Sequence, residues 1–495
     1  MVVLLGLGPG DPALVTKEAW ETLAAAHTVY LRTNRHPVVA ALPPHLTVHS
    51  FDALYERSAH FDEVYRAVAD TVLAHARAKP DSEVIYATPG HPLVGEAASA
   101  LILRRARQEG IAVRVVAGLS FVEPILETLA LHADLDPGLL DPLAGLQVCD
   151  ALEIAAAYHP PLNPDRPALI AQVYSRLVAS DLKLVLMNQY PPRHPAWVVR
   201  ATGDQRRCAS VVLSELDHGD WFDHLTSVYL PPMPRPSSFE ALQAVVAHLR
   251  APEGCPWDRE QTHESLRRTL LEETYEVLTA IDQGDMQALA EELGDLLLNV
   301  VMQAQIATEG EVFRMTDTIA HIIAKLKRRH PHVFGDAQAQ TSSEVIAHWD
   351  AIKRQEKRDA GVHNPSALDG IAEALPALAF AQKVAHRADR AGFSWGSHEA
   401  RLRKVREELE EILAARDDAH RAEEFGDLIF ALANWADGYG IDLESAARQA
   451  TQKFAQRFRA LEQRVRAQGQ DLKALPREQA LALWQQVKAD RLAEP

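Results

Sequence analysis

A proline-rich segment divides this chain of 495 residues into two halves of different texture. Residues 231–238 read PPMPRPSS, with four prolines in eight residues, a density that neither a helix interior nor a central strand tolerates. Before this segment, short β-rich runs alternate with helical stretches; after it, Ala, Leu, Glu, Gln and Arg dominate a long helical periodicity. We therefore expect a linker at 231–238 between an α/β domain at 1–230 and an all-α half.

Six runs in the first half predict strands that alternate with helices. They are VVLLGLG at the start, VIYA around Ile85, VRVVAG around Val115, ALIAQVY around Ile170, LKLVLM around Val185 and SVVLSEL around Val212. Strands and helices that take turns are typical of an α/β domain.

Charge and composition restrict the classes of partner. The formal net charge of −17 has the wrong sign for a protein that neutralises a nucleic-acid backbone, so we expect no nucleic-acid partner. No apolar run reaches the roughly 18 residues of a membrane span, and the amino terminus lacks the basic start of a signal peptide. The three cysteines are far apart and form no CxxC pattern. These features predict a cytoplasmic protein without a membrane partner.

The second half contains an internal repeat. LLEETYEV and AEELGDLLLNV, near Asp295, are echoed by VREELEEI and AEEFGDLIFAL, near Asp427. Two copies of one helical module are therefore expected, at 239–362 and 363–495, with the boundary near residues 361–365.

Paired acids in each copy have the spacing of a metal site. Residues three apart lie on one face of a helix, and if two such faces oppose each other, four carboxylates converge and require a compensating cation. Magnesium is the best candidate because it is a hard cation that prefers oxygen ligands and bridges to phosphates. The expected ligands are Glu273, Glu276, Glu292 and Asp295 in the first copy, and Glu408, Glu411, Glu424 and Asp427 in the second.

The alternative for a single EExxE run is a solvated helix face that forms salt bridges between adjacent turns. Here each acid cluster runs directly into apolar residues, as in GDLLLNVV and GDLIFALAN, so the acids lie at the edge of a buried stripe. Repetition of the pattern also favours the metal site.

EExxE followed by ExxD resembles the MazG nucleoside triphosphate pyrophosphohydrolases, and the resemblance covers roughly residues 239–488. It extends to CPWDREQTHESL from Cys255, KRRHPHVFGD from Lys327, AGFSW from Ala391 and KFAQRF from Lys453. The resemblance implies magnesium on the eight acids above, free nucleoside triphosphates as substrates, and monophosphate and pyrophosphate as products. It also implies assembly through helical bundles, so we expect a homodimer or a higher homo-oligomer.

A bound triphosphate requires basic side chains near the metal. Lys and Arg, or Trp and Lys, recur four residues apart on the helices that follow the acids, and the family resemblance implies nucleotide contacts for them; ordinary solvated cations and a core tryptophan are the alternative. The candidates are Lys325, Arg329, Trp349 and Lys353 in the first copy, and Lys404, Lys453, Arg457, Trp484 and Lys488 in the second. Glu272 and Glu407, the first acids of each EE pair, are candidates for positioning the attacking water, although helix phase turns them away from their neighbours.

Two smaller features are expected to be structural. The CPWD run at Cys255 is predicted to anchor a loop before the first acid helix, with Trp257 in the core. Cys255 has no evident basic partner that would make it a catalytic thiolate.

Glycine-rich loops characterise the first half. GLGPGDP at 6–12 directly follows a strand, and TPGHPLVGE, AGLSF, LKLVLM and VVLSEL come later in the chain. Their order resembles the tetrapyrrole methylase family, which has two α/β subdomains with S-adenosylmethionine in the cleft between them. The resemblance covers residues 1–230 and implies cofactor contacts by Pro9, Gly10, Asp11, Pro89, Gly90, His91, Ser120 and Met187. Its substrate cannot be identified from the sequence.

This chain has PGHP and AGLS where family members commonly show PGDP and PGxS. The alternative for this domain is therefore a retained scaffold that binds the cofactor weakly. For the whole chain, the alternative is a methyltransferase whose helical half serves dimerisation or nucleotide sensing.

Overall fold

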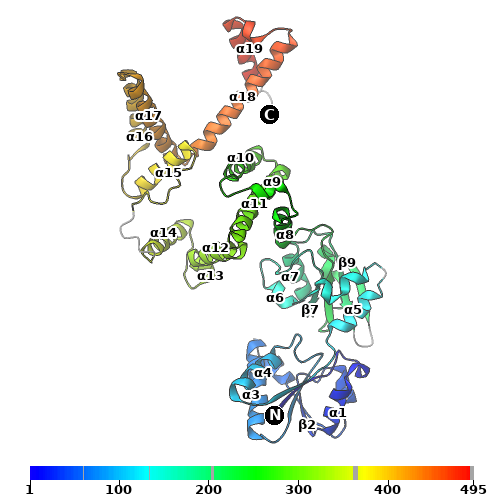
Figure 1. Cartoon of the computed structure of the whole chain (residues 1–495). Coiled ribbons are helices and arrows are strands. Elements are labelled where there is room, and N and C mark those ends of the chain that lie inside the picture. The colour runs from blue at the N-terminus through cyan, green and yellow to red at the C-terminus, as the bar shows by residue number, and fades with distance from the viewer. Residues whose placement is uncertain (59–60, 133, 202–205, 360–365, 491–495) are drawn as a thin grey trace. The chain divides into compact units, whose positions relative to one another are not determined.

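The computed structural model describes two compact units, Met1–Ala320 and His321–Pro495, and the division falls within helix α12 (Met315–Arg329). Figure 1 shows α/β structure in the first part of the chain and helices in the remainder. The residues described are 1–58, 61–132, 134–201, 206–359 and 366–490. The module boundary expected near 361–365 lies outside them.

A parallel five-stranded sheet forms the first subdomain, in the order β3-β2-β4-β1-β5. Alternate residues of the interior strand β1 pack into two different apolar clusters, one on each face of the sheet. Such double burial is typical of parallel strands covered by helices on both sides, and it explains the continuous apolar run VVLLG. The strands are β1 (Val2–Gly6), β2 (Thr28–Leu31), β3 (Thr47–Ser50), β4 (Val84–Thr88) and β5 (Val113–Val116).

Helices cover both faces of this sheet (Figure 1). Residues of α3 (Phe61–Ala78) and α4 (Ala97–Glu109) join one cluster, and residues of α1 (Lys17–Ala25) join the other. The carboxyl ends of the strands therefore remain free for loops, which is where ligands bind in open α/β sheets.

The second subdomain has a mixed five-stranded sheet, in the order β6-β7-β10-β8-β9. Only β6 and β7 pair in parallel, whereas β10 and β8 pair with their neighbours antiparallel. Helices α6 and α7 cover one face and α5 the other. The elements are α5 (Val122–Ala130), β6 (Gln147–Asp150), α6 (Ala151–Ala155), β7 (Ala168–Ala171), α7 (Arg176–Leu186), β8 (Pro195–Arg200), β9 (Arg207–Val212) and β10 (Thr226–Leu230).

Five of the six expected strands are confirmed, and the sixth, LKLVLM, is wrong because it lies in α7. Ser175 caps this helix, and its buried residues recur at a spacing of three to four. The short apolar run is therefore one stripe of an amphipathic helix, which periodicity alone does not distinguish from a buried strand.

The segment 231–238 contains no helix or strand, but it is fastened to the second subdomain. Asp165 accepts hydrogen bonds from the backbone and hydroxyl groups of Ser237 and Ser238, at 2.5–3.4 Å. Ser238 also caps the next helix, α8. The connection is therefore held to the second subdomain by hydrogen bonds.

The remainder is helical, and two helix hairpins dominate it. In the first, α10 packs on α11 across a turn in which Gly284 has a φ of +68°; in the second, α16 packs on α17, which Asp417 caps. The helices are α8 (Phe239–Arg250), α9 (Pro256–Glu260), α10 (Arg267–Gln283), α11 (Met286–Glu309), α12, α13 (Pro331–Phe334), α14 (Ser342–Asp359), α15 (Ala377–Arg390), α16 (His398–Ala414), α17 (Asp418–Gly438), α18 (Leu443–Ala467) and α19 (Arg477–Asp490).

The structure corrects one core prediction in this half. Trp257, in the short helix α9, is 61% exposed, so it is not a core residue. Within the described residues, no helix is long and apolar enough to cross a membrane.

Candidate active site

Three carboxylates converge in the α16–α17 hairpin. One oxygen each from Glu408, Glu424 and Asp427 lies within 4.8 Å of the others. Glu408 is only 3% exposed, and its Oε2 has no hydrogen-bond partner. A buried carboxylate oxygen without a partner is costly, so the cluster calls for a cation.

Basic side chains already contact part of this cluster. The Lys404 ammonium lies 2.7 Å from Glu408 Oε1 and 2.7 Å from Glu407 Oε1, and these carboxylates raise the pKa of Lys404. His420 Nε2 lies 3.0 Å from Glu424 Oε1. A hydrogen bond between the carboxyl groups of Glu411 and Glu408 raises the pKa of Glu411.

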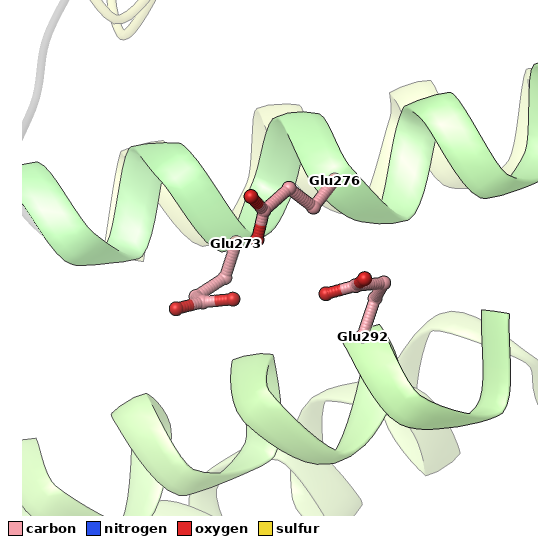
Figure 2. Close-up of side chains that lie close together, drawn as sticks. All are labelled: Glu273, Glu276 and Glu292. Atoms are coloured by element: carbon pink, nitrogen blue, oxygen red, sulfur yellow. The ribbon is translucent and has the colours of Figure 1, made fainter. Parts of the chain in front are cut away.

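The first hairpin repeats the arrangement on a more exposed surface. Figure 2 shows Glu273 and Glu276 of α10 facing Glu292 of α11, and one oxygen of each lies within 4.8 Å of the others. Partial burial, followed by repulsion from Glu276 and Asp295, raises the pKa of both Glu273 and Glu292. Three of the four expected acids of the first module therefore lie together, and Asp295 is close enough to act on their charges.

The donor set in both hairpins fits a hard divalent cation. Carboxylate oxygens form the core of both clusters, and the unpartnered Oε2 of Glu408 is a ready ligand atom. Three of the four expected acids come together in each module, with Asp295 a close electrostatic neighbour in the first and Glu411 a hydrogen-bonded neighbour in the second.

Glu272 and Glu407 lie outside the clusters, as helix phase indicated. Glu272 is paired with Arg268 Nε at 2.8 Å, and Glu407 with Lys404. Both carboxylates are more than half exposed, and each accepts a hydrogen bond from a basic side chain on its own helix.

The nucleotide candidates of the first module lie on α12 and α14. Arg329 Nη2 lies 2.7 Å from Glu356 Oε2, and Arg328 joins the same carboxylate, so Arg329 is already engaged. Trp349 has a buried indole N–H without a hydrogen-bond partner, and its ring meets His330 edge-on at 5.1 Å. Lys325 lies on α12 and Lys353 on α14, so these two helices carry all four candidates.

In the second module, Lys404 lies against the acids, whereas the other candidates lie on α18 and α19. Trp484 packs beside Phe454 at 5.1 Å and against the apolar cluster of Leu461, Val465 and Val487. Arg457 has a buried Nε without a partner. The structure therefore brings the α18 and α19 candidates, Lys453, Arg457, Trp484 and Lys488, onto one helix pair.

The three glycine loops of the first subdomain meet closely. A Cβ on Gly6 would lie 2.5 Å from Gly90 O and 2.7 Å from Gly118 N, and Gly8 and Gly90 exchange backbone hydrogen bonds at φ near +70°. Only glycine permits this approach of three backbones. The loops predicted from the sequence to form one site are thus in contact.

A cavity of about 610 Å³ opens beside these loops. Pro9, Pro89 and Gly90 line it, together with residues of both subdomains. Its wall includes Gln172, which has a φ of +64°. This backbone conformation is strained for a residue other than glycine, and such strain is concentrated at functional sites.

The remaining cofactor candidates have local roles. Asp11 accepts from Ala13 N–H, His91 Nδ1 accepts from Leu93 N–H, and Ser120 donates to Glu123, so each organises its own turn next to Gly10 or Gly90. Met187 ends α7 and packs against the core of the second subdomain. Its predicted place at the end of a strand is wrong, and it is not among the lining residues of the cavity.

Sequence reasoning missed several residues beside the second acid cluster. His420 has the i,i+4 spacing to Glu424 that could have identified it. Arg401, Trp395 and Asn434 line a cavity next to Glu408 and Asp427, and no spacing rule marks them.

Comparisons with known proteins agree with this division of the chain. Residues 1–217 match the model of the tetrapyrrole (corrin/porphyrin) methylases, and residues 261–334 match that of the MazG nucleotide pyrophosphohydrolase domain. The uncharacterized protein YabN of Bacillus subtilis is 36% identical over 98% of both chains. The nucleoside triphosphate pyrophosphohydrolase of Escherichia coli is 44% identical over 52% of this chain and 99% of its own.

A solved structure is also similar to the first half. The uroporphyrin-III C-methyltransferase of Thermus thermophilus, complexed with S-adenosyl homocysteine, is 25% identical, with a TM-score of 0.34 over 46% of this chain and 96% of its own.

Fold and acid clusters define a fusion of an α/β methylase-type domain with all-α hydrolase modules. The chain belongs to the MazG nucleoside triphosphate pyrophosphohydrolase family, in the full-length arrangement it shares with YabN. The expected fold classes and family are thereby confirmed.

Proposed function

We propose that the helical half hydrolyses free nucleoside triphosphates to monophosphate and pyrophosphate with magnesium on the paired acids. The observation that carries the proposal is the convergence of three carboxylates in each hairpin, with Glu408 Oε2 buried and unpartnered. Packing alone would place apolar side chains there, because buried like charges destabilise a fold.

Each group in the second module then has a task. Magnesium held by Glu408, Glu411, Glu424 and Asp427 would neutralise the phosphate oxygens of the substrate. Lys404, which already lies against two carboxylates, is placed to exchange one of them for a phosphate oxygen. Once released, Glu407 is free to orient the attacking water for in-line displacement at the α-phosphorus, and Glu272 has the same proposed role in the first module.

The remaining basic and aromatic candidates complete the proposed nucleotide site. Charged groups of the substrate require Lys and Arg contacts, and an aromatic ring beside these cations can pack against the nucleotide. We assign these tasks to the pairs on α12 and α14 and on α18 and α19 described above. The proposed domains are 1–230, the connection 231–238, and modules 239–362 and 363–495.

We also propose that the helical half acts as a homodimer or a higher oligomer. The acid hairpins expose large apolar side chains, among them Leu413 at 87% and Phe425 at 50%. Such faces are unusual on a monomer and typical of interfaces between copies. A second helical layer would also shield the acids from water, which one hairpin cannot do.

An assay with the purified full-length protein tests the hydrolase. A panel of nucleoside triphosphates is incubated with magnesium, and monophosphate and pyrophosphate are quantified together. We expect equimolar release of both products and none after chelation of the metal. Release of orthophosphate and diphosphate would contradict attack at the α-phosphorus, and absence of any product would favour the alternative of a nucleotide-sensing module.

For the first half we propose S-adenosylmethionine binding at the glycine loops, by a methylase domain whose substrate the structure does not define. The close contact of Gly6, Gly90 and Gly118 beside the large cavity supports it. PGHP in place of PGDP is compatible with this loop, since His91 Nδ1 accepts the turn hydrogen bond that an aspartate would accept.

A further inference from the structure

A cavity opens beside the second acid hairpin, and part of its wall has no role in the catalytic assignments. It measures about 230 Å³ and lies directly beside the acid cluster, because Glu408 and Asp427 belong to its wall. Residues of α16, α17 and the preceding loop complete it: Trp395, Arg401, Lys404, Phe430, Ala431 and Asn434.

Asn434 is the unusual member of this wall. Asn434 lines the cavity and is only 3% exposed. Neither the oxygen nor the nitrogen of its side-chain amide has a hydrogen-bond partner. Buried amides in folded proteins are nearly always paired. An unpaired donor and acceptor side by side therefore indicate a partner that enters from the cavity.

The backbone around this amide is held in place. Arg401 Nη1 donates to the carbonyl oxygen of Asn434 at 2.8 Å, and Nη2 lies 3.4 Å from Asp389. Gly438 leaves room for that guanidinium, since a Cβ there would lie 2.9 Å from Nη1. A charged, buried side chain thus fixes the position of Asn434, which is the preorganisation that selective binding requires.

The first module has apolar side chains at the positions that correspond to Arg401 and Asn434. In the register that aligns the two acid sets, Leu266 corresponds to Arg401 and Met302 to Asn434. Both residues are buried in the apolar cluster that includes Val246 and Met315. Two copies of one hairpin therefore differ at this place: one is filled with apolar side chains, and the other keeps a polar cavity.

We infer that this cavity binds the nucleobase of the substrate and that Asn434 recognises its edge. This inference rests on the proposed hydrolase function of the same site. A purine or pyrimidine presents a hydrogen-bond donor beside an acceptor, which is the complement of a side-chain amide. The triphosphate of a nucleotide seated there would extend toward Glu408 and Asp427.

Size and chemistry support a base as the occupant. The cavity is smaller than the roughly 300–1,000 Å³ of pockets that enclose a whole drug-sized ligand, so it suits one ring system of a larger molecule. Trp395 and Phe430, whose rings meet edge-on at 6.0 Å, supply aromatic surface for stacking. Asn434 has the role of a specificity-determining residue, and it does not act on the scissile bond.

The test uses the full chain with the first module silenced by Glu273→Gln and Glu276→Gln. Asn434→Leu, or Asn434→Ala if the leucine variant does not fold, is compared with its parent on nucleoside triphosphates and on ribose 5-triphosphate, which lacks a base. We expect KM for the nucleotides to rise about 10- to 100-fold, as for a lost bidentate base contact, with kcat within about threefold. KM for the abasic compound should not change.

Met302→Leu in the same background is the matched control, because it alters the corresponding buried place in the silenced module and conserves volume. It should leave every KM unchanged. Equal losses on nucleotides and on the abasic triphosphate would show that Asn434 only supports the fold, and unchanged KM values would show that the cavity holds water alone. If the parent releases no pyrophosphate from any triphosphate, the proposed hydrolase function itself fails.

Discussion

Glu408 and Glu411 lie one helical turn apart, so α16 can present both to one cation. Their shared hydrogen bond raises the pKa of Glu411, and the buried Glu408 retains one unpartnered oxygen. In the proposed function, the chemistry of the second module therefore depends on a few carboxylate oxygens whose charges repel one another unless a cation compensates them.

The first prediction concerns these two acids. Glu408→Gln with Glu411→Gln, combined with the silenced first module, should reduce pyrophosphate release by roughly a thousandfold, since loss of one transition-state contact typically costs a hundred- to a thousandfold. Initial rates at saturating magnesium measure it. The matched control is Glu410→Gln on the same helix, outside the cluster, which should retain activity. Substantial turnover by the double variant would disprove the carboxylate assignment.

A second residue-scale prediction concerns Gly6. Gly6→Ala would force the first loop away from Gly90 and Gly118, so S-adenosylmethionine affinity should fall at least about tenfold. Calorimetry on the full chain measures it, with Gly294→Ala as control because a Cβ there meets no atom within 4 Å. If the unmodified protein shows no binding at millimolar cofactor, the domain is a scaffold and the assignment is wrong.

At the scale of elements, a charged contact connects α12 with α14. Arg328 and Arg329 both bind the Glu356 carboxylate and, through hydrogen bonds, lower its pKa to about 2. Because the folded pKa is lower than the unfolded one, the stabilisation is fully present above about pH 4.5 and is lost as the pH falls toward about 2.

Glu356→Gln should therefore lower Tm at pH 6, and the difference from the unmodified protein should shrink as the pH approaches 3. Because the Arg328 side chain is 53% exposed and Glu356 and Arg329 are partly exposed, solvent screens these pairs and their contribution is about 1 kcal/mol or less. Thermal unfolding at a series of pH values measures the difference. Glu253→Gln removes an exposed carboxylate that forms no ion pair among the described residues, so it controls for the change in net charge. A pH-independent difference would refute the electrostatic origin.

At the scale of the whole molecule, the exposed apolar faces of the acid hairpins predict self-association. Both hairpins show them, with Leu293 and Leu297 on α11 and Leu409 and Leu413 on α16. Light scattering at micromolar concentration should give at least twice the 54.7 kDa of one chain. Leu413→Lys should weaken the assembly, whereas Leu143→Lys, at an exposed position of the methylase-type domain, should not. A fully active monomer would contradict the proposal.

The sequence by itself determined the elements whose signal is local and repeated. The acids of both modules follow from their three-residue spacing and from repetition, and β1 with its glycine loop follows from an apolar run ending in small residues. The change from alternating strands and helices to helices alone was also predictable from the sequence, because hydrophobic periodicity depends only on neighbouring residues.

Other features depended on contacts between distant residues. The helix α7 was mistaken for a strand because a short apolar run fits either, and only packing against the sheet decides. Likewise, whether a tryptophan is covered depends on packing between distant residues, and Trp257 is 61% exposed among the described residues. Only the tertiary structure placed Asn434 beside Arg401 and opposite Glu408, since residues on two helices share a cavity through the way the helices pack, and no spacing along the chain records that.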